Sequence, residues 1–311
     1  MSITLKNITK SYKKVTAVDD ISFEVKPGEL FGLIGPDGAG KTTLFRILTT
    51  LLFADKGEAT VAGYDVVKDY KEIRKSVGYM PGRFSLYQDL TVEENLEFFA
   101  TIFGTTIEEN YDLIKDIYVQ IEPFKKRRAG KLSGGMKQKL ALSCALIHKP
   151  KVLFLDEPTT GVDPVSRKEF WDMLKRLNDK GITTLVSTPY MDEAALCDRI
   201  ALIQEGKILK IDSPSNIIDQ HEKQIYNVEA KDMYQLIQNL KEFPENESVY
   251  AFGEFVHYTH SNENFHPEKL EKFLSERDHK NISIKPTSPS IEDVFMDLAR
   301  KKDVKPTENE V

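Results

Sequence analysis

One glycine-rich segment has the residue types and spacing of a phosphate-binding loop: Gly35-Pro36-Asp37-Gly38-Ala39-Gly40-Lys41-Thr42-Thr43. It matches the pattern G-x4-G-K-S/T and lies between a strand-like run, Glu29–Ile34, and a helix-like run, which is the context that the pattern requires. The glycines let backbone N–H groups surround phosphate oxygens, and the helix N-terminus adds positive potential. We expect Lys41 to reach the β- and γ-phosphates of ATP, and Thr42 to place its hydroxyl on Mg²⁺. Asp37 is unusual, because an acidic side chain beside a polyphosphate is unfavourable unless it points away.

A pair of acidic residues supplies the second half of such a site. The apolar run Val152–Leu155 predicts a buried strand, and Asp156 and Glu157 follow it directly. We expect Asp156 to hold Mg²⁺ through water and Glu157 to polarise the attacking water as the catalytic base. An acidic pair after a strand is usually a helix cap when it stands alone. Together with the phosphate loop it indicates ATP hydrolysis, with Glu157 and Lys41 as the catalytic residues.

The elements that must position these residues alternate between strands and helices. Short apolar runs such as Thr183–Ser187 read as buried strands, and Arg199–Gln204 with Lys207–Ile211 reads as a hairpin. This alternation predicts an α/β core with a largely parallel sheet. Together with the phosphate loop, it predicts a P-loop NTPase core. The stretch from about 93 to 149 has a mostly helical pattern and predicts a helical subdomain within a first domain at 1–220.

A second pattern begins where the composition turns polar near 212–221. The order of strand-like and helix-like runs from Gln224 to Lys285 is β-α-β-β-α-β, which predicts a small α+β, ferredoxin-like accessory domain at 222–301. A helix then follows over Ser290–Lys301, with Ser290 as its N-cap and Asp293 at the third helical position. The charged residues 302–311 predict a disordered tail.

The bulk composition describes an ordinary globular protein of 311 residues with a net charge of −6. The acidic balance, with a pI near 5.7, argues weakly against nucleic acid as a partner. The two cysteines, Cys144 and Cys197, make neither a disulfide framework nor a metal site and fit a reducing cytosol. We find no signal peptide and no apolar run of the ~18–20 residues that a membrane span needs.

Between the loop and the acidic pair stands Leu132-Ser133-Gly134-Gly135-Met136-Lys137-Gln138. It is similar to the LSGGQ signature of ABC ATPases, with Met136 at the fifth position in place of the usual Gln. With the acidic pair and Thr160-Gly161-Val162-Asp163 following in order, the chain is identified as a member of that family from residue 1 to about 220. The tail segment Ser288–Phe295 resembles the end of many exporter-type subunits of the family.

The resemblance implies further roles for individual residues. Tyr12 matches the aromatic residue that stacks on adenine, and Val18 lies near it. The signature residues Ser133, Gly134 and Gly135 are implied to contact the γ-phosphate of an ATP bound by a second subunit. Asp163 is implied to lie in a loop that crosses the interface, because two such subunits dimerise head to tail, as a homodimer or a heterodimer.

Two positions depart from the family pattern. Gly82 replaces a Gln that contacts Mg²⁺ and the attacking water, and Pro189 replaces a His that contacts the γ-phosphate; Gln88 is an unlikely substitute. Proline has neither a side-chain donor nor a backbone N–H. We therefore expect a site that binds ATP, turns it over poorly and pairs with an unlike partner. An alternative is that Glu157 suffices without these helpers.

The favoured function is the ATP-binding subunit of a membrane exporter, bound peripherally at the cytoplasmic face of the membrane. In relatives the segment corresponding to Phe84–Asn95 docks a separate transmembrane permease, with Phe84, Leu86, Tyr87 and Leu90 as candidate anchors or simple core residues. Two alternatives remain: a soluble ABC ATPase acting on the ribosome or on nucleic acid, and a regulatory module that binds ATP without hydrolysing it.

Overall fold

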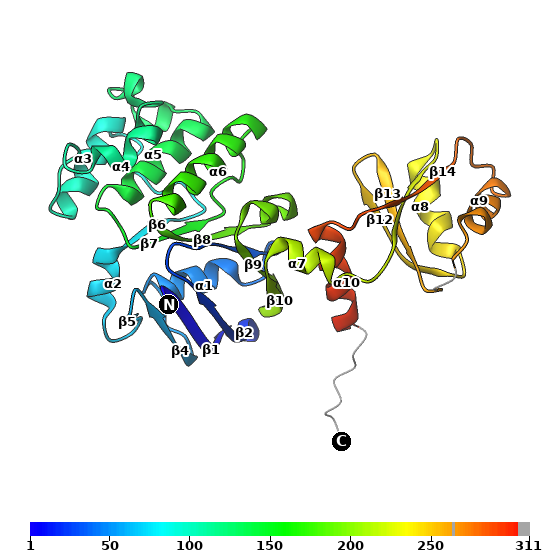
Figure 1. The fold of residues 1–311 in the computed structure, drawn as a ribbon. Helices are drawn as coiled ribbons and strands as arrows, with labels where there is room; N and C mark the ends of the chain where they lie inside the picture. The colour runs from blue at the N-terminus through cyan, green and yellow to red at the C-terminus, as the bar shows by residue number, and fades with distance from the viewer. Residues whose placement is uncertain (263–264, 304–311) are drawn as a thin grey trace. The chain divides into compact units, whose positions relative to one another are not determined.

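The computed structural model describes residues 1–262 and 265–303, which fold as two compact units (Figure 1). The first unit is Met1–Pro214 and the second begins at Ser215, before the predicted boundary at 220. The predicted tail at 302–311 lies outside the described residues, except for Lys302 and Asp303 at the end of the last helix. No helix in the described ranges has the length and apolar character needed to cross a membrane.

A six-stranded sheet forms the centre of the first unit and confirms the predicted α/β core. Its strand order is β10-β9-β3-β8-β7-β6, and all neighbours pair in parallel except the edge hairpin of β9 and β10. Every residue of β3, β7 and β8 is buried, because helices cover both faces of the sheet. The strands are β3 (Leu30–Ile34), β6 (Val77–Met80), β7 (Val152–Asp156), β8 (Thr183–Thr188), β9 (Arg199–Gln204) and β10 (Lys207–Asp212).

A second, antiparallel sheet packs over helix α1 and has the order β2-β1-β4-β5. The sequence pattern predicts strands at Ser2–Asn7 and Ile21–Val25 and a helix at Lys41–Leu52. In the structure β1 and β2 are longer than these runs, and α1 ends already at Leu48. The elements are β1 (Ile3–Tyr12), β2 (Val15–Val25), α1 (Lys41–Leu48), β4 (Lys56–Val61), β5 (Tyr64–Asp65) and α2 (Tyr70–Ser76).

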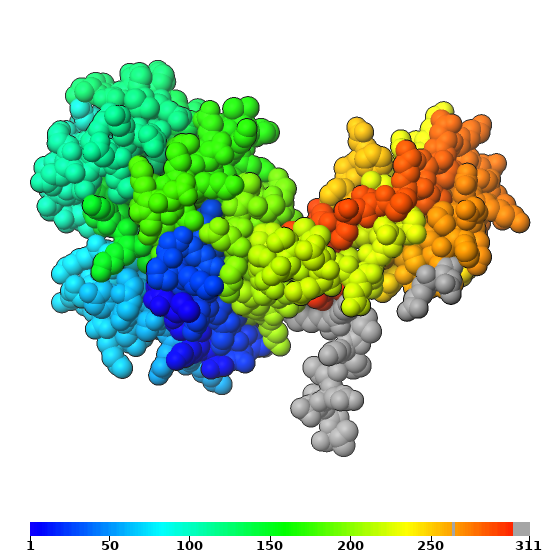
Figure 2. Space-filling view, in the orientation of Figure 1, coloured from blue at the N-terminus to red at the C-terminus, as the bar shows by residue number. Residues whose placement is uncertain are grey.

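The helical part predicted between 93 and 149 contains α3 (Val92–Ile102), α4 (Tyr111–Tyr118) and α5 (Gly134–Leu146), with short 3-10 turns η1 (Glu122–Phe124) and η2 (Ala129–Lys131). Its residues, coloured teal, gather at one end of the first unit in the space-filling view (Figure 2). Thr91 and Glu94 form a reciprocal capping box that starts α3. Helix α6 (Pro164–Asp179) and the turn η3 (Met191–Leu196) complete the unit.

The second unit has the predicted β-α-β-β-α-β order. Its antiparallel sheet has the strand order β12-β13-β11-β14, which is that of a ferredoxin-like fold. One face of the sheet packs against α8 and α9 around a core that includes Leu240, Tyr258 and Leu274. The elements are α7 (Pro214–Asp219), β11 (Ile225–Glu229), α8 (Met233–Glu242), β12 (Asn246–Phe252), β13 (Phe255–His260), α9 (Pro267–Ser275), β14 (Ser283–Thr287) and α10 (Ile291–Asp303).

Helix α10 is anchored to this sheet through a buried carboxylate. Ser290 caps the helix as predicted: its N–H and its hydroxyl donate to Asp293, and the Asp293 N–H donates back to Ser290 Oγ. Asp293 also accepts hydrogen bonds from Tyr250 on β12 and from His257 Nδ1, 2.6 Å away on β13. Burial alone raises the pKa of Asp293, but the hydrogen bonds from His257, Ser290 and Tyr250 outweigh it and lower that pKa to about 2.

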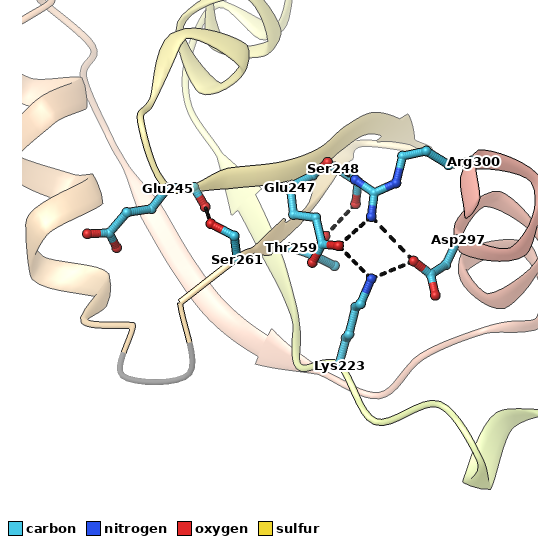
Figure 3. A network of polar contacts seen from close by, with 8 residues as sticks. All are labelled: Lys223, Glu245, Glu247, Ser248, Thr259, Ser261, Asp297 and Arg300. Atoms are coloured by element: carbon cyan, nitrogen blue, oxygen red, sulfur yellow. Dashed lines mark hydrogen bonds and ion pairs between the residues drawn. The ribbon is translucent and has the colours of Figure 1, made fainter. Parts of the chain in front are cut away.

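A second polar network holds the other end of α10 (Figure 3). Lys223 Nζ lies 2.7 Å from Glu247 and 2.6 Å from Asp297, and Arg300 pairs with the same two carboxylates at 2.5 and 3.4 Å. Two positive and two negative charges therefore alternate around a ring, which offsets the cost of partly burying each of them. The two networks together fix α10 along its length.

We expect Asp293→Asn to lower the free energy of unfolding of the second unit by about 3 kcal/mol, because a buried acceptor of several hydrogen bonds loses its charge. The folded-state pKa lies below the ordinary 3.8, so the carboxylate stabilises the fold above that pH and its contribution is lost as the pH falls toward 2. Urea titrations between pH 7 and 2 measure both effects. Asp278→Asn, at an exposed position, is the matched control; equal effects at both positions would contradict the anchoring role.

Candidate active site

The phosphate loop connects β3 to α1, as the sequence predicts. A Cβ atom at Gly35 would lie 2.1 Å from the carbonyl oxygen of Ile203, and one at Gly40, where φ is +102°, would lie 2.3 Å from that of Ala17. Any side chain at these two positions would collide with backbone, so the tight loop requires glycine. Lys41 is only 3% exposed, and its Nζ donates to the carbonyls of Gly35 (2.8 Å) and Pro36 (2.9 Å). The cation is therefore fixed inside the loop.

A pocket of about 140 Å³ opens over this loop, and it collects several of the predicted residues. Its lining residues are Ala17, Gly38, Gly40, Lys41, Thr42, Thr43 and Glu157. Pro36 and Asp37 are exposed and Ala39 is buried, and none of the three lines the pocket. Asp37 thus does not add an acidic side chain to the pocket wall.

The two residues that the family resemblance assigns to the adenine occupy different environments. Tyr12, at the end of β1, is 43% exposed and lies outside the pocket. Val18 is completely buried in the core, and its Cγ2 would lie 3.4 Å from a Cβ atom at Gly40. Val18 therefore packs beneath the loop, while the neighbouring Ala17 contributes to the pocket wall.

The acidic pair lies at the end of β7, as predicted. Asp156 is buried and accepts a hydrogen bond of 2.7 Å from Ser187 Oγ on the adjacent strand β8. The Glu157 N–H donates to Ser187 O (3.1 Å) and faces Ser187 Oγ at 3.0 Å, and Glu157 Oε1 lies 3.2 Å from Lys41 Nζ. Glu157 has a φ of +51°, a conformation that costs about 1–3 kcal/mol for a residue other than glycine. Its surroundings must therefore hold it in place.

The two departures from the family pattern both border this site. A Cβ atom at Gly82, two residues after β6, would lie 3.0 Å from Asp156 O and 3.8 Å from Glu157 Cβ. Pro189 follows Thr188, whose carbonyl oxygen accepts a hydrogen bond of 3.2 Å from the Gly35 N–H. Gln88 lies elsewhere, because its carbonyl accepts the Gly130 N–H (2.9 Å) in the helical part.

The signature segment forms the N-terminus of α5. Ser133 caps the helix by accepting the Met136 N–H at 3.3 Å, and the first turn carries no acidic residue. A Cβ atom at Gly135 would lie 2.8 Å from Ser166 Oγ on α6, so a larger residue there would require Ser166 to move. Ser133 and Gly134 are exposed, and the signature does not line the phosphate pocket. The positive end of this helix is thus open to a ligand from outside the chain.

The loop before α6 lies beside the signature. A Cβ atom at Gly134 would lie 3.5 Å from the carbonyl oxygen of Gly161. Asp163 caps α6 by accepting the Ser166 N–H at 3.0 Å, and Pro164 occupies the first helical position. The family resemblance assigns both segments to a dimer interface, and the structure places them next to each other on the first unit.

The sequence patterns missed two contributors to the site. Ser187 holds both acidic residues, and its only signal in the sequence is a polar residue near the end of an apolar strand. Ala17 lines the pocket although it belongs to β2, far from the loop in sequence. Long-range placement of this kind follows from sheet packing, which no local pattern records.

The residues present fit a nucleoside triphosphate with Mg²⁺. Backbone N–H groups, the α1 N-terminus and Lys41 supply positive potential for phosphate oxygens. Mg²⁺ usually takes one or two protein oxygens and completes its shell with phosphate and water. The hydroxyl of Thr42, on the pocket wall, and the carboxylate of Asp156, at the end of β7, are oxygen ligands of the required kind.

Comparisons with known proteins agree with this geometry. The model of a family described as "ABC transporter" matches residues 18–160. The probable multidrug ABC transporter ATP-binding protein YbhF of Escherichia coli is 42% identical over 69% of this chain, which spans only 38% of that relative. The linearmycin resistance ATP-binding protein LnrL of Bacillus subtilis is 39% identical, over 68% of this chain and 69% of LnrL. The Nod factor export ATP-binding protein I of Mesorhizobium japonicum is 33% identical, over 97% of this chain and 88% of the relative.

The solved structures that resemble this chain include ATP-binding cassettes of the same family. The dimeric ATP-binding cassette MJ0796 in a post-hydrolysis state, bound to ADP and Pi, is similar to 68% of this chain, over 98% of that chain, with a TM-score of 0.62 and 27% identity. The ATP-binding subunit of an ABC transporter matches 71% of this chain, over 93% of its own, with a TM-score of 0.65 and 26% identity. The chain therefore belongs to the ABC transporter family, whose ATP-binding domain it carries.

Proposed function

We propose that this chain is an ATPase subunit that binds Mg-ATP and powers a membrane exporter. The observation that carries the proposal is the convergence of Lys41, Thr42 and Glu157 on one pocket over the phosphate loop. Names of relatives support the transport role, since they refer to multidrug transport, linearmycin resistance and Nod factor export. The substrate path would lie in a separate permease, and the chain would bind peripherally at the cytoplasmic face of the membrane.

Each residue of the site would have its own role in ATP hydrolysis. Lys41 would bind the terminal phosphates, while Thr42 and Asp156 would hold Mg²⁺, which neutralises phosphate charge when bound. Glu157 would accept a proton from the attacking water, and its strained backbone keeps the carboxylate 3.2 Å from Lys41. Tyr12 would stack on the adenine. Ser133, Gly134 and Gly135 would complete the second nucleotide site of a head-to-tail dimer.

The site also supports an asymmetric pairing. Gly82 and Pro189 border the acidic pair and the phosphate loop but offer no side-chain hydrogen bond. Losing one preorganised donor to a developing anion costs about 10²–10³ in rate. We therefore infer that this chain's own site hydrolyses ATP weakly, and that its signature serves a partner chain with a complete site.

A groove in the first unit fits the docking of a permease helix. It encloses about 380 Å³ between the sheet core and the helical part. Its apolar walls include Leu51, Leu86, Phe99 and Phe103. Of the predicted anchors, Leu86 thus lines the groove, whereas Tyr87 is half exposed and packs edge-to-face on Phe98. A continuous apolar groove of this size on an ATPase subunit is suited to a short amphipathic helix.

Leu51→Glu should reduce recovery of the chain with an integral membrane protein about tenfold, because it places a charge in the apolar groove. Leu51 is 58% exposed, so the substitution should not disturb folding. The measurement is affinity capture of the tagged chain from detergent-solubilised membranes of its native cells. Val67→Glu, at an aliphatic residue that is 53% exposed, is the matched control. Capture of ribosomes in place of a membrane protein would overturn the exporter assignment.

A further inference from the structure

We infer that Glu193 is a positioning residue that locks the segment carrying Glu157 to the end of β8 and, through it, to the phosphate loop. The inference rests on the proposed catalytic role of Glu157 and concerns a residue outside the nucleotide pocket. Glu193 lies in η3 and is only 1% exposed.

Both carboxylate oxygens of Glu193 are engaged by threonine hydroxyls. Thr159 Oγ1 donates to Oε1 at 2.7 Å, and Thr188 Oγ1 donates to Oε2 at 2.5 Å. The Thr188 hydroxyl also accepts the Tyr190 N–H at 3.1 Å, which leaves its own hydrogen for the carboxylate. Arg167 Nε lies 3.5 Å from Oε1 and supplies the opposite charge. A buried carboxylate requires partners of this kind, so the cluster has one well-defined arrangement.

The two threonines belong to the segments that meet in the active site. Thr159 lies two residues after Glu157, and Thr188 directly follows Ser187, which holds Asp156 and the Glu157 backbone. Thr188 also accepts the Gly35 N–H through its carbonyl oxygen. The strained Glu157 is therefore held on one side by Ser187 and on the other by the bridge from Thr159 through Glu193 to Thr188.

Arg167 extends the same cluster toward the proposed dimer interface. Its backbone N–H donates to the Asp163 carbonyl at 2.9 Å, and its guanidinium lies 4.2 Å from the centre of the Tyr190 ring. Glu193 thus connects the position of Glu157 with the loop that ends at Asp163. Since displacing a catalytic group by about 1 Å can cost roughly 10² in rate, such a connection matters for hydrolysis as well as for stability.

The test separates hydrogen bonding from packing. Removing Glu193 itself risks misfolding, so the variants are Thr159→Val and Thr188→Val, which keep shape but lose the hydroxyl, and Thr159→Ser and Thr188→Ser, which keep the hydroxyl. Thr184→Val is the matched control, because Thr184 is buried on the same strand β8 and its hydroxyl has no partner among the described residues.

Hydrogen exchange of the full chain without nucleotide is measured first, at the amides of Thr160 and Val162, which donate to Glu157 O and Thr159 O. We expect exchange about tenfold faster in the valine variants and unchanged rates in the serine variants and in Thr184→Val. Two results would overturn the inference in favour of simple packing. Either the serine variants exchange as fast as the valine variants, or the valine variants exchange at the normal rate.

Single-turnover hydrolysis with the chain in excess over ATP is the second readout. We expect the rate to fall about tenfold in the valine variants, while the Kd for Mg-ATP changes by less than about twofold. A parallel loss of affinity, or no loss of rate, would contradict a positioning role. Fast hydrolysis by the unmodified chain would contradict the proposed weak site but would leave this comparison valid.

Discussion

Restoring the Gln and His side chains of the family pattern, with Gly82→Gln and Pro189→His together, should raise ATP turnover by the purified chain about 10²-fold or more. Each side chain would return a preorganised hydrogen bond to the site, and one such contact is worth ~10²–10³ in rate. The geometry allows this, because both positions already border the acidic pair and the phosphate loop. Position 82 is tight: its Cβ atom would lie 3.0 Å from Asp156 O, so the loop must shift by a few tenths of an ångström.

Steady-state phosphate release measures this gain, and the same pair of substitutions in a Glu157→Gln background is the control. The gain should vanish there, because the restored contacts assist a reaction that still needs the catalytic base. If turnover of the doubly restored chain stays at the original level, Gly82 and Pro189 are not what limits hydrolysis.

Lys41→Ala should weaken Mg-ATP binding by about 10²-fold, because the phosphate charge then lacks its buried partner, a loss of about 3 kcal/mol. Lys41 is almost completely buried and is held by two loop carbonyls, so its charge is already fixed at the loop that would hold the phosphates. Equilibrium binding of a fluorescent ATP analogue, with Mg²⁺ present, measures the change.

Lys175→Ala, which removes an exposed lysine of α6 instead, controls for the loss of one positive charge. It should leave the Kd unchanged, since an exposed charge is screened by solvent and salt. Similar losses in the two variants would mean that net charge rather than the loop geometry governs affinity.

Much of the fold could be predicted because its signals are local. The strand–loop–helix around Lys41 and the hairpin of β9 and β10 each lie within a short segment, and the structure has them where the patterns place them. The extensions of β1 and β2 pair with each other around the turn between Tyr12 and Val15, and they were missed because most of their residues are polar and not buried. Helix α1 ends early at Leu48, where the chain turns through Thr50 at a φ of +63°.

The residues of the site likewise include some that local motifs predict and others that only tertiary packing places there. The loop, the acidic pair and the signature are contiguous motifs, and their residue types predict their chemistry. Ser187 reaches the acidic pair only because the parallel strands β7 and β8 lie side by side. Glu193 contacts Thr159 and Thr188 from the turn η3, which no local motif indicates. Resemblance to the family can also select a neighbouring residue. It assigns Val18 to the adenine, but Val18 is buried beneath the loop and Ala17 lines the pocket.

The measurement that tests the central claim most directly is steady-state ATP hydrolysis by the purified chain, with Mg-ATP binding measured in parallel and Glu157→Gln as control. The account predicts clear Mg-ATP binding with only slow turnover, which falls further in Glu157→Gln because that variant lacks the catalytic base. Robust turnover that Glu157→Gln abolishes would contradict it: Gly82 and Pro189 would then be tolerated, and the chain would be better described as one half of a homodimeric motor.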